Sequence, residues 1–174
     1  MTDGPADAPI HVLFLCTANS ARSQIAEALL ANRARTRFHV ASAGTHPAAA
    51  VHPDAIVALR RIGIDWTGHQ PKGLDGVRDA TWDFIITTCD RVKETCPAFP
   101  GRPIYAHWSI PDPADVTAFD RPKAFRDTVS LLSWRIDLML ALRPELLSRT
   151  AAEQRLRSIG LDVPHDAEQP QQSH

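Results

Sequence analysis

Short apolar runs alternate with segments of helical periodicity along most of this chain. The run IHVLFLC at residues 10–16 is rich in Val, Leu and Phe, a composition typical of a strand buried on both faces. Three similar runs predict further strands, over residues 37–44, 82–89 and 102–109. Apolar positions spaced three and four residues apart predict helices over residues 23–32, 52–63, 119–147 and 150–159. We expect Pro144 to kink or interrupt the third helix near its end.

This order of elements indicates one α/β domain. Strands separated by helices imply right-handed crossovers, which build a parallel sheet, here of four strands with helices on both faces. The chain contains no internal repeat and no sign of a second domain. We therefore predict a single domain over residues 10–160, with flexible tails at residues 1–9 and 161–174.

Composition and charge narrow the class of partner. Of the 174 residues, 44% are hydrophobic and 22% are charged, values that are ordinary for a globular protein with its own core. The formal net charge of −1 argues against nucleic acid or an anionic membrane as the main partner, because both select basic surfaces. No apolar stretch reaches the roughly 20 residues that span a bilayer, and the acidic N-terminal segment lacks a secretory-signal pattern. We expect a cytoplasmic protein.

The chain contains three cysteines, Cys16, Cys89 and Cys96. An odd number does not suggest a disulfide framework, and no Cys or His pair has zinc-finger spacing, so no metal site is expected. In a reducing compartment such thiols either pack as small hydrophobes or react. Ligands of parallel sheets bind beyond the carboxyl ends of the strands. Cys16, Gly44 and Cys89 each end a predicted strand, so we expect them at that edge, together with the segment that follows the fourth strand.

The segment after Cys16 has the composition of an anion site. It contains no bulky side chain before Arg22, so successive backbone N–H groups can point inward, and the following helix adds its positive end. The Arg22 guanidinium can hold two oxygens of a tetrahedral oxyanion. The same positive field should lower the pKa of Cys16 and make it a nucleophile. The predicted oxyanion-binding residues are Thr17, Ala18, Asn19, Ser20, Ala21, Arg22 and Ser23. The alternative is that Cys16 only packs and Arg22 is a surface charge, but their position between a strand and a helix start favours a site.

The segment VLFLCTANSARSQIAEALL resembles the phosphate-binding loop of the low-molecular-weight protein tyrosine phosphatase superfamily, which includes arsenate reductases that cycle through disulfides. The resemblance extends over residues 10–142 and includes SAGTHP at 42–47 and HWSIPDPA at 107–114. It implies the family's flavodoxin-like winding of the sheet. It also implies that Asn19 holds the shape of the loop and that Ser23 donates a hydrogen bond to the Cys16 thiolate.

Two features favour the arsenate reductase branch of this superfamily. The segment TTCDRVKETCP resembles the arsenate reductases, with Cys89 and Cys96 where phosphatases need no cysteine, although two packing cysteines are the alternative. The Asp112-Pro113 pair resembles the family's acid loop, but the paired aromatics that grip a phosphotyrosine ring are absent after it. Together these features favour a small inorganic oxyanion as the substrate.

The resemblance implies a three-cysteine mechanism. Cys16 attacks arsenate while Asp112 protonates the leaving oxygen, and Asp112 is preferred over Asp115 and Asp120 because it matches the family motif. Cys89 then attacks the sulfur of Cys16 and releases arsenite, and Cys96 attacks Cys89 to leave a Cys89–Cys96 disulfide. The polar segment 90–96 is expected to be mobile. No bound cofactor is expected, only an external thiol donor, either thioredoxin or glutaredoxin with glutathione, and the protein should act as a monomer.

Two alternatives remain open at this point. The first is a low-molecular-weight phosphatase that hydrolyses phosphotyrosine or small phosphomonoesters with Cys16, Arg22 and Asp112. The second is a sensor that chelates arsenite or zinc through three thiols without turnover. Some relatives also bind potassium beside the loop, but Lys72 and Gly73 stand where those relatives carry an acid, so no potassium site is expected.

Overall fold

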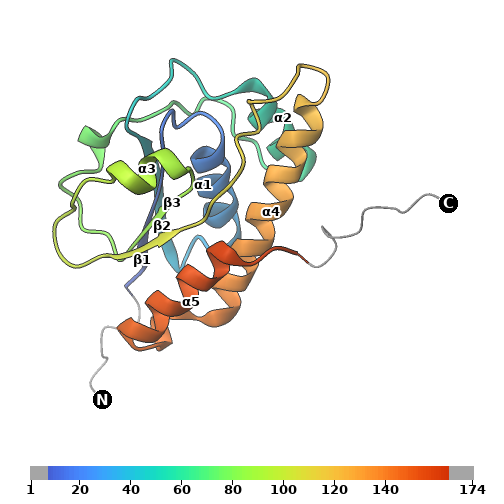
Figure 1. The fold of residues 1–174 in the computed structure, drawn as a ribbon. Helices are drawn as coiled ribbons and strands as arrows, with labels where there is room; N and C mark the ends of the chain where they lie inside the picture. Colours follow the sequence, from blue (N-terminus) through green and yellow to red (C-terminus); the bar gives the residue numbers. More distant parts are fainter. Residues whose placement is uncertain (1–7, 165–174) are drawn as a thin grey trace.

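Four parallel strands form the centre of the structure, a computed structural model that describes residues 8–164 (Figure 1). The strands are β1 (Ile10–Cys16), β2 (Phe38–Gly44), β3 (Phe84–Thr87) and β4 (Ile104–His107). Their order across the sheet is β2-β1-β3-β4, and every neighbouring pair is parallel. The predicted α/β fold with flavodoxin-like winding is therefore confirmed.

The helices follow the strands along the chain. They are α1 (Arg22–Arg33), α2 (Pro53–Arg61), α3 (Asp90–Thr95), α4 (Arg121–Leu142) and α5 (Arg149–Leu161), with short 3₁₀ turns at η1 (Leu74–Gly76) and η2 (Pro144–Leu146). Within the described residues, no helix is both long enough and apolar enough to cross a membrane. The predicted tails lie largely outside the described residues.

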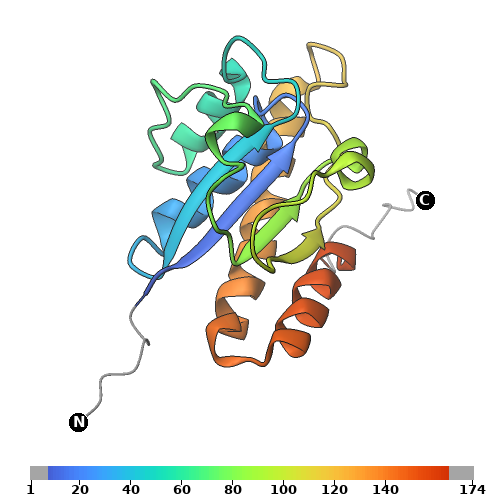
Figure 2. The same cartoon turned by 90° about the vertical axis from the view of Figure 1, so that its left-hand side faces the viewer.

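The two faces of the sheet are covered unequally. Side chains along each strand alternate between these faces, so each strand contributes to two separate cores. Val12 and Phe14 of β1 belong to the larger core, under α1, α2, α4 and α5. Leu13 and Leu15 face the other way, into a smaller core with Trp82 and other residues of the connecting segments. Figure 2 shows α1 and α4 behind the sheet, with η1 and α3 on its other side. Helices thus cover both faces, but the second face has only short ones.

Two predicted segments differ from the structure. The helix expected over 119–147 ends at Leu142, because Arg143 adopts a left-handed conformation (φ 48°) and Pro144 cannot continue the helix; η2 then connects it to α5. Residues Asp90–Thr95, for which the sequence predicted no helix, form helix α3, and the predicted mobility of segment 90–96 stays a prediction. Val92 is its one buried side chain, so it carries no apolar periodicity from which a helix could be predicted.

The strand ends place four segments at one edge of the sheet. Cys16 pairs in register with Gly44, and Thr87 pairs with His107. The predicted strands over 82–89 and 102–109 are shorter in the structure, so Cys89 lies just beyond its strand. The edge that the sequence predicted as the site is therefore assembled by the parallel order of the strands.

Candidate active site

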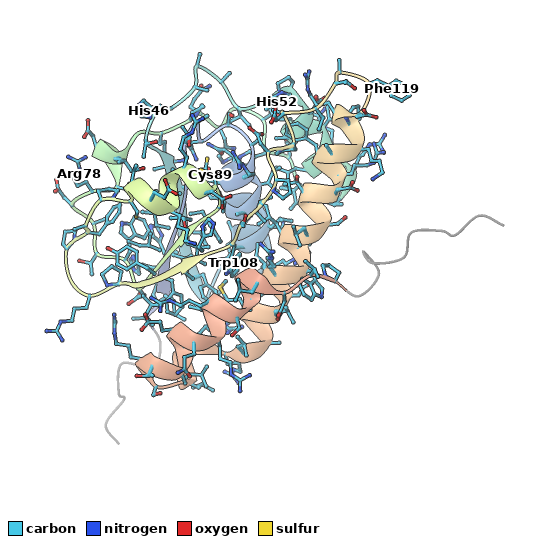
Figure 3. The ribbon with its side chains drawn as sticks, viewed as in Figure 1. His46, His52, Arg78, Cys89, Trp108 and Phe119 are labelled. Carbon is cyan, nitrogen blue, oxygen red and sulfur yellow. The ribbon has the colours of Figure 1, made fainter. Side chains whose placement is uncertain are left out.

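A cavity of about 410 Å³ opens at the carboxyl edge of the sheet, and we call it the oxyanion cavity. It is lined by Cys16, Thr17, Ala18, Ser20, Ala21, Arg22, Cys89, Asp90, Arg91, Asp112 and Ala114. Figure 3 shows Cys89 where the chain enters α3, above the sheet. The structure therefore brings together the predicted nucleophile, the arginine, the acid and the second cysteine. The third cysteine, Cys96, is not among these residues.

The loop of residues 16–22, which we call the oxyanion loop, is held with its carbonyl groups facing outward. The carbonyl oxygens of Cys16, Thr17, Ala18 and Ser20 accept hydrogen bonds from backbone N–H groups within residues 45–52, at 2.8–3.2 Å. A peptide N–H points opposite to the carbonyl group of the same peptide bond. The outward carbonyls therefore turn the amides of the loop toward the cavity, as an oxyanion nest requires.

Asn19 occupies the centre of this loop and is fully buried. Its φ of 48° lies in the left-handed region, where asparagine is tolerated better than most residues. Its side-chain Nδ2 donates to Ser23 Oγ at 2.8 Å and to Ser42 Oγ at 2.9 Å. Its Oδ1 accepts from Gln24 Nε2 at 2.9 Å and from the Lys72 backbone N–H at 2.8 Å. Asn19 thus connects the loop to α1, to β2 and to the segment after α2, in agreement with its predicted role.

A polar layer beneath the loop completes this network. Ser42 Oγ donates to Glu27 Oε2 at 2.5 Å, and Lys72 Nζ lies 3.5 Å from the same oxygen. Trp66 Nε1 donates to Gln24 Oε1 at 2.8 Å. The Lys72 ammonium therefore faces the largely buried Glu27 carboxylate. The sequence did not single out Gln24 or Trp66, because Gln24 bonds to Asn19 from α1 and Trp66 bonds to Gln24 from a distant segment, a contact that no local pattern contains.

The Cys16 thiol lies at the bottom of the cavity and is only 3% exposed. Its Sγ is 2.8 Å from Ser23 Oγ and accepts from the Asn19 backbone N–H at 3.1 Å. Burial raises the pKa of Cys16 above its ordinary value, while the hydrogen bonds from Ser23 and Asn19 and the Arg22 charge lower it in part. The predicted lowering of this pKa is therefore wrong in direction, because loss of solvent around the sulfur outweighs the local donors.

Arg22 is positioned between the oxyanion loop and the acid loop. Its Nη1 donates to the Ile110 carbonyl oxygen at 3.0 Å, and its Nη2 lies 3.7 Å from Asp112 Oδ2. Asp112 Oδ1 accepts from the Ala114 backbone N–H at 3.0 Å, and its side chain is 44% exposed. Asp115 does not line the cavity, and Asp120 accepts a hydrogen bond from Thr117, which precedes α4. Of these three carboxylates only Asp112 lines the cavity, and its role as the acid stays a prediction.

Cys89 and Cys96 lie at opposite ends of α3. Cys89 Sγ is 3.3 Å from Thr17 Oγ1, whereas Cys96 lines a second cavity with Lys93 and other residues. All three cysteines are free thiols. A helical rise of about 1.5 Å per residue separates the ends of this segment by about 10 Å, whereas a disulfide needs Cα atoms within about 7 Å. Cys89 and Cys96 therefore cannot pair while α3 is wound.

An unexpected carboxylate anchors the start of α3. Asp90 Oδ1 accepts from His107 Nε2 at 2.8 Å and from Ser109 Oγ at 3.1 Å. These hydrogen bonds lower the pKa of Asp90, chiefly through His107. His107 Nδ1 lies 2.7 Å from Thr87 Oγ1. No motif in the sequence indicated that His107 holds α3 in place.

The described residues contain no group of three or more His, Cys, Asp or Glu side chains that could hold a metal ion. The three thiols do not converge, because Cys96 lines a different cavity from Cys16 and Cys89. This arrangement therefore does not favour the alternative of a sensor that chelates arsenite or zinc through three thiols. The oxyanion cavity instead combines two buried thiols, inward amides, two arginines and two carboxylates. A thiol beside amides and arginines suits nucleophilic attack on a tetrahedral oxyanion.

The sequence and fold of this chain are similar to those of known proteins. A family model described as low molecular weight phosphotyrosine protein phosphatase matches residues 11–152, a range that contains every residue of the candidate site. An arsenate reductase of Halalkalibacterium halodurans is 35% identical over 112 residues, which cover 64% of this chain and 80% of that protein. An arsenate reductase solved in its oxidized state has a TM-score of 0.65 at 25% identity, covering 76% of this chain and 97% of that one. A thioredoxin-dependent arsenate reductase of Corynebacterium glutamicum has a TM-score of 0.54 at 32% identity, covering 75% of this chain and 64% of that one.

Proposed function

Since this chain belongs to the low-molecular-weight phosphotyrosine protein phosphatase family, we propose that it is the kind of member that reduces arsenate to arsenite. The observation that carries this proposal is the second thiol in the oxyanion cavity. Cys89 lines the same cavity as Cys16, next to Thr17 of the loop. Hydrolysis of a phosphate ester needs one nucleophilic thiol, whereas reduction of arsenic by two electrons needs a second sulfur to form a disulfide.

The first step is attack by the Cys16 thiolate on arsenate held by the loop amides and Arg22. A sulfur–arsenic bond forms, and the leaving oxygen departs as water after protonation by Asp112. Ser23 and the Asn19 N–H are in place to stabilise the thiolate once the proton has left Cys16. These hydrogen bonds compensate in part for the cost of charging a buried sulfur.

The second step transfers two electrons to arsenic. The Cys89 thiolate attacks Cys16 Sγ, the sulfur–arsenic electron pair remains on arsenic, and arsenite leaves. A Cys16–Cys89 disulfide results. Cys96 then attacks Cys89 Sγ, Cys16 departs as a thiolate, and a Cys89–Cys96 disulfide forms. This third step requires α3 to unwind, because its two flanking cysteines are too far apart in the wound helix.

The composition of α3 supports such unwinding. The helix has six residues, and only Val92 is buried. Isolated helices shorter than about 12 residues are marginal in water, so α3 depends on its tertiary contacts. Asp90 supplies a contact of this kind at its N-terminal end. The segment therefore opens at low cost once its anchor is released.

The reductant is an external thiol donor. We propose a thioredoxin-like protein or glutaredoxin with glutathione, and no bound cofactor, because the cycle ends on a disulfide that a thiol can reduce. The name of the Corynebacterium glutamicum relative, which is thioredoxin-dependent, supports this class of donor. Such donors work in a reducing compartment, so we propose a cytoplasmic enzyme. All the proposed groups come from one chain, so a monomer suffices.

A phosphatase is the second candidate. The family match and the Cys16, Arg22 and Asp112 set favour it, because these groups are also those that hydrolyse a phosphomonoester. Loss of Cys89 or Cys96 would leave such hydrolysis intact. The acid loop offers Ala114 at the cavity and no aromatic side chain there, which favours a small oxyanion over a phosphotyrosine.

The test is an assay of arsenate-dependent NADPH oxidation with thioredoxin and thioredoxin reductase. Cys16→Ser, Cys89→Ser and Cys96→Ser variants are compared with the unchanged protein and with a surface variant, Ser158→Ala. We expect no turnover in the three cysteine variants. Cys96→Ser should still release one arsenite per protein and accumulate a Cys16–Cys89 disulfide, detectable by mass spectrometry of the peptides.

Other outcomes would change the assignment. Turnover of Cys96→Ser with glutathione and glutaredoxin alone would mean that a small thiol replaces the last intramolecular step. Hydrolysis of an aryl phosphate by every variant except Cys16→Ser, without arsenate-dependent NADPH oxidation, would identify a phosphatase and refute the reductase proposal.

A further inference from the structure

A second cavity, of about 370 Å³, lies beside the third cysteine, and we call it the Cys96 cavity. Its lining contains three basic side chains, Lys93, His107 and Arg157, and no carboxylate. Tyr105, Ala106 and Leu161 add apolar surface to the lining. The volume is within the range of sites that bind small molecules, about 300–1,000 Å³. A cavity lined by basic and apolar side chains suits a small organic anion.

Cys96 is the accessible cysteine of this chain. Cys16 and Cys89 are 3% and 4% exposed, whereas Cys96 is partly exposed. Its Sγ lies 3.6 Å from the Pro97 carbonyl oxygen. A thiol reagent from solvent therefore meets Cys96 first, and it meets it inside a basic cavity.

Two of the basic groups are fixed to parts of the fold other than α3. Arg157 of α5 donates from Nε to the Tyr105 carbonyl oxygen at 3.3 Å and pairs through Nη2 with Glu153 at 2.6 Å. His107 at the end of β4 is held between Thr87 and Asp90. Both lie on elements other than α3, so they stay with the sheet and α5 when α3 unwinds, although His107 then keeps Thr87 and loses Asp90, the first residue of α3. They form a preorganised site to which Cys96 brings its sulfur.

We propose that the Cys96 cavity binds a low-molecular-weight thiol that carries carboxylate groups, and that this thiol exchanges disulfides with Cys96. The inference rests on the proposed function, since it assigns the entry point of the reductant in that cycle. The thiolate attacks Cys96 Sγ of the Cys89–Cys96 disulfide, a mixed disulfide forms at Cys96, and Cys89 leaves as a thiolate. A second molecule of the thiol then attacks the mixed disulfide, frees Cys96 and departs as the oxidised dimer, so two thiols supply two electrons.

The reverse reaction on the reduced protein tests the site without arsenate. In the full chain carrying Cys16→Ser and Cys89→Ser, the remaining Cys96 thiolate attacks glutathione disulfide, forms a mixed disulfide and releases one glutathione thiolate. Cystamine, a disulfide whose charged groups are ammoniums, serves as the probe of opposite charge. The second-order rate constants for both probes are measured by intact-protein mass spectrometry at low and at high salt.

The readout is the ratio of the glutathione disulfide rate to the cystamine rate. Any change in the thiolate fraction of Cys96 affects both probes equally and cancels in this ratio. We expect the ratio to favour glutathione disulfide and to fall by about threefold or more in Lys93→Gln and in Arg157→Gln, with a smaller preference at high salt. Arg155→Gln, which removes an exposed charge from the same helix outside the cavity, should leave the ratio unchanged.

The outcomes separate this inference from the proposed function. A ratio near one, or one that the Lys93 and Arg157 variants do not change, would overturn the inference even if arsenate reduction with thioredoxin is demonstrated; a protein donor would then act at Cys96 without this cavity. A charge-selective ratio in a protein that fails to reduce arsenate would keep the thiol site and refute only the reductase proposal. Thermal melting of each variant identifies any that is unfolded, and Lys93→Met, which keeps the apolar stem, then replaces Lys93→Gln.

Discussion

Replacing Asn19 tests whether one buried amide holds the oxyanion loop. Asn19→Gly removes the side chain but keeps a residue that adopts a positive φ without strain. Asn19→Ala removes the same side chain and adds the cost of placing a Cβ in the left-handed region. Comparison of the two variants therefore separates the hydrogen bonds of the amide from the backbone conformation.

The magnitude follows from the four hydrogen bonds of the Asn19 side chain. A net contribution of about 1 kcal/mol for each bond gives a loss of about 4 kcal/mol in the free energy of unfolding for Asn19→Gly. The left-handed conformation adds about 1 kcal/mol for Asn19→Ala. Since whole domains are stable by about 5–15 kcal/mol, Asn19→Ala should be close to the limit of folding.

Urea unfolding followed by tryptophan fluorescence measures these losses, with and without phosphate. Phosphate should stabilise the unchanged protein by binding only the folded state, and this gain should largely disappear in both variants because the nest is disordered. Ser130→Ala is the control, because Ser130 is exposed on α4 and does not line the oxyanion cavity, and it should change stability by less than about 0.5 kcal/mol and keep the gain from phosphate. A loss below about 1 kcal/mol in Asn19→Gly, with phosphate stabilisation intact, would refute this reasoning, since a single hydrogen bond is worth about that much.

Three further predictions follow from the same site. Gly44→Ala should weaken phosphate binding and destabilise the fold by about 1–3 kcal/mol, because a Cβ there would clash with the backbone of the oxyanion loop. Gly76→Ala is the control, since its Cβ would meet open space, and it should be neutral in urea unfolding. The rate of Cys16 alkylation by iodoacetamide should rise with pH, with a midpoint above the ordinary pKa of a thiol. Ser23→Ala should move that midpoint higher still, because the hydrogen bond that it removes favours the thiolate. An unchanged midpoint would contradict the assigned contact. Asp90→Asn should loosen α3, so amide hydrogen exchange in this helix should accelerate by about twofold or more. Equal exchange in both proteins would mean that the Asp90 carboxylate does not anchor α3.

Local features of the chain were predicted well because their causes are local. The strand before Cys16, the small residues after it and the helix start that follows are adjacent in sequence, so their composition alone predicts an anion site. The parallel arrangement then explains why Cys89 and Asp112 lie at the same edge as Cys16, far from it in sequence. Helix α3 was missed because a short helix with one buried residue has no periodicity to detect.

Tertiary contacts decided the properties on which the chemistry depends. The outward carbonyls of the oxyanion loop result from hydrogen bonds to residues 45–52, and the anchor of α3 comes from His107 on a different strand. The pKa of Cys16 moves upward because neighbouring side chains exclude water from its sulfur, a quantity that spacing along the chain does not contain. Cys96 faces a separate cavity because α3 is wound in this conformation. Residue types and their order therefore predict which groups approach the edge of the sheet, whereas burial and long-range hydrogen bonds determine their orientation and charge.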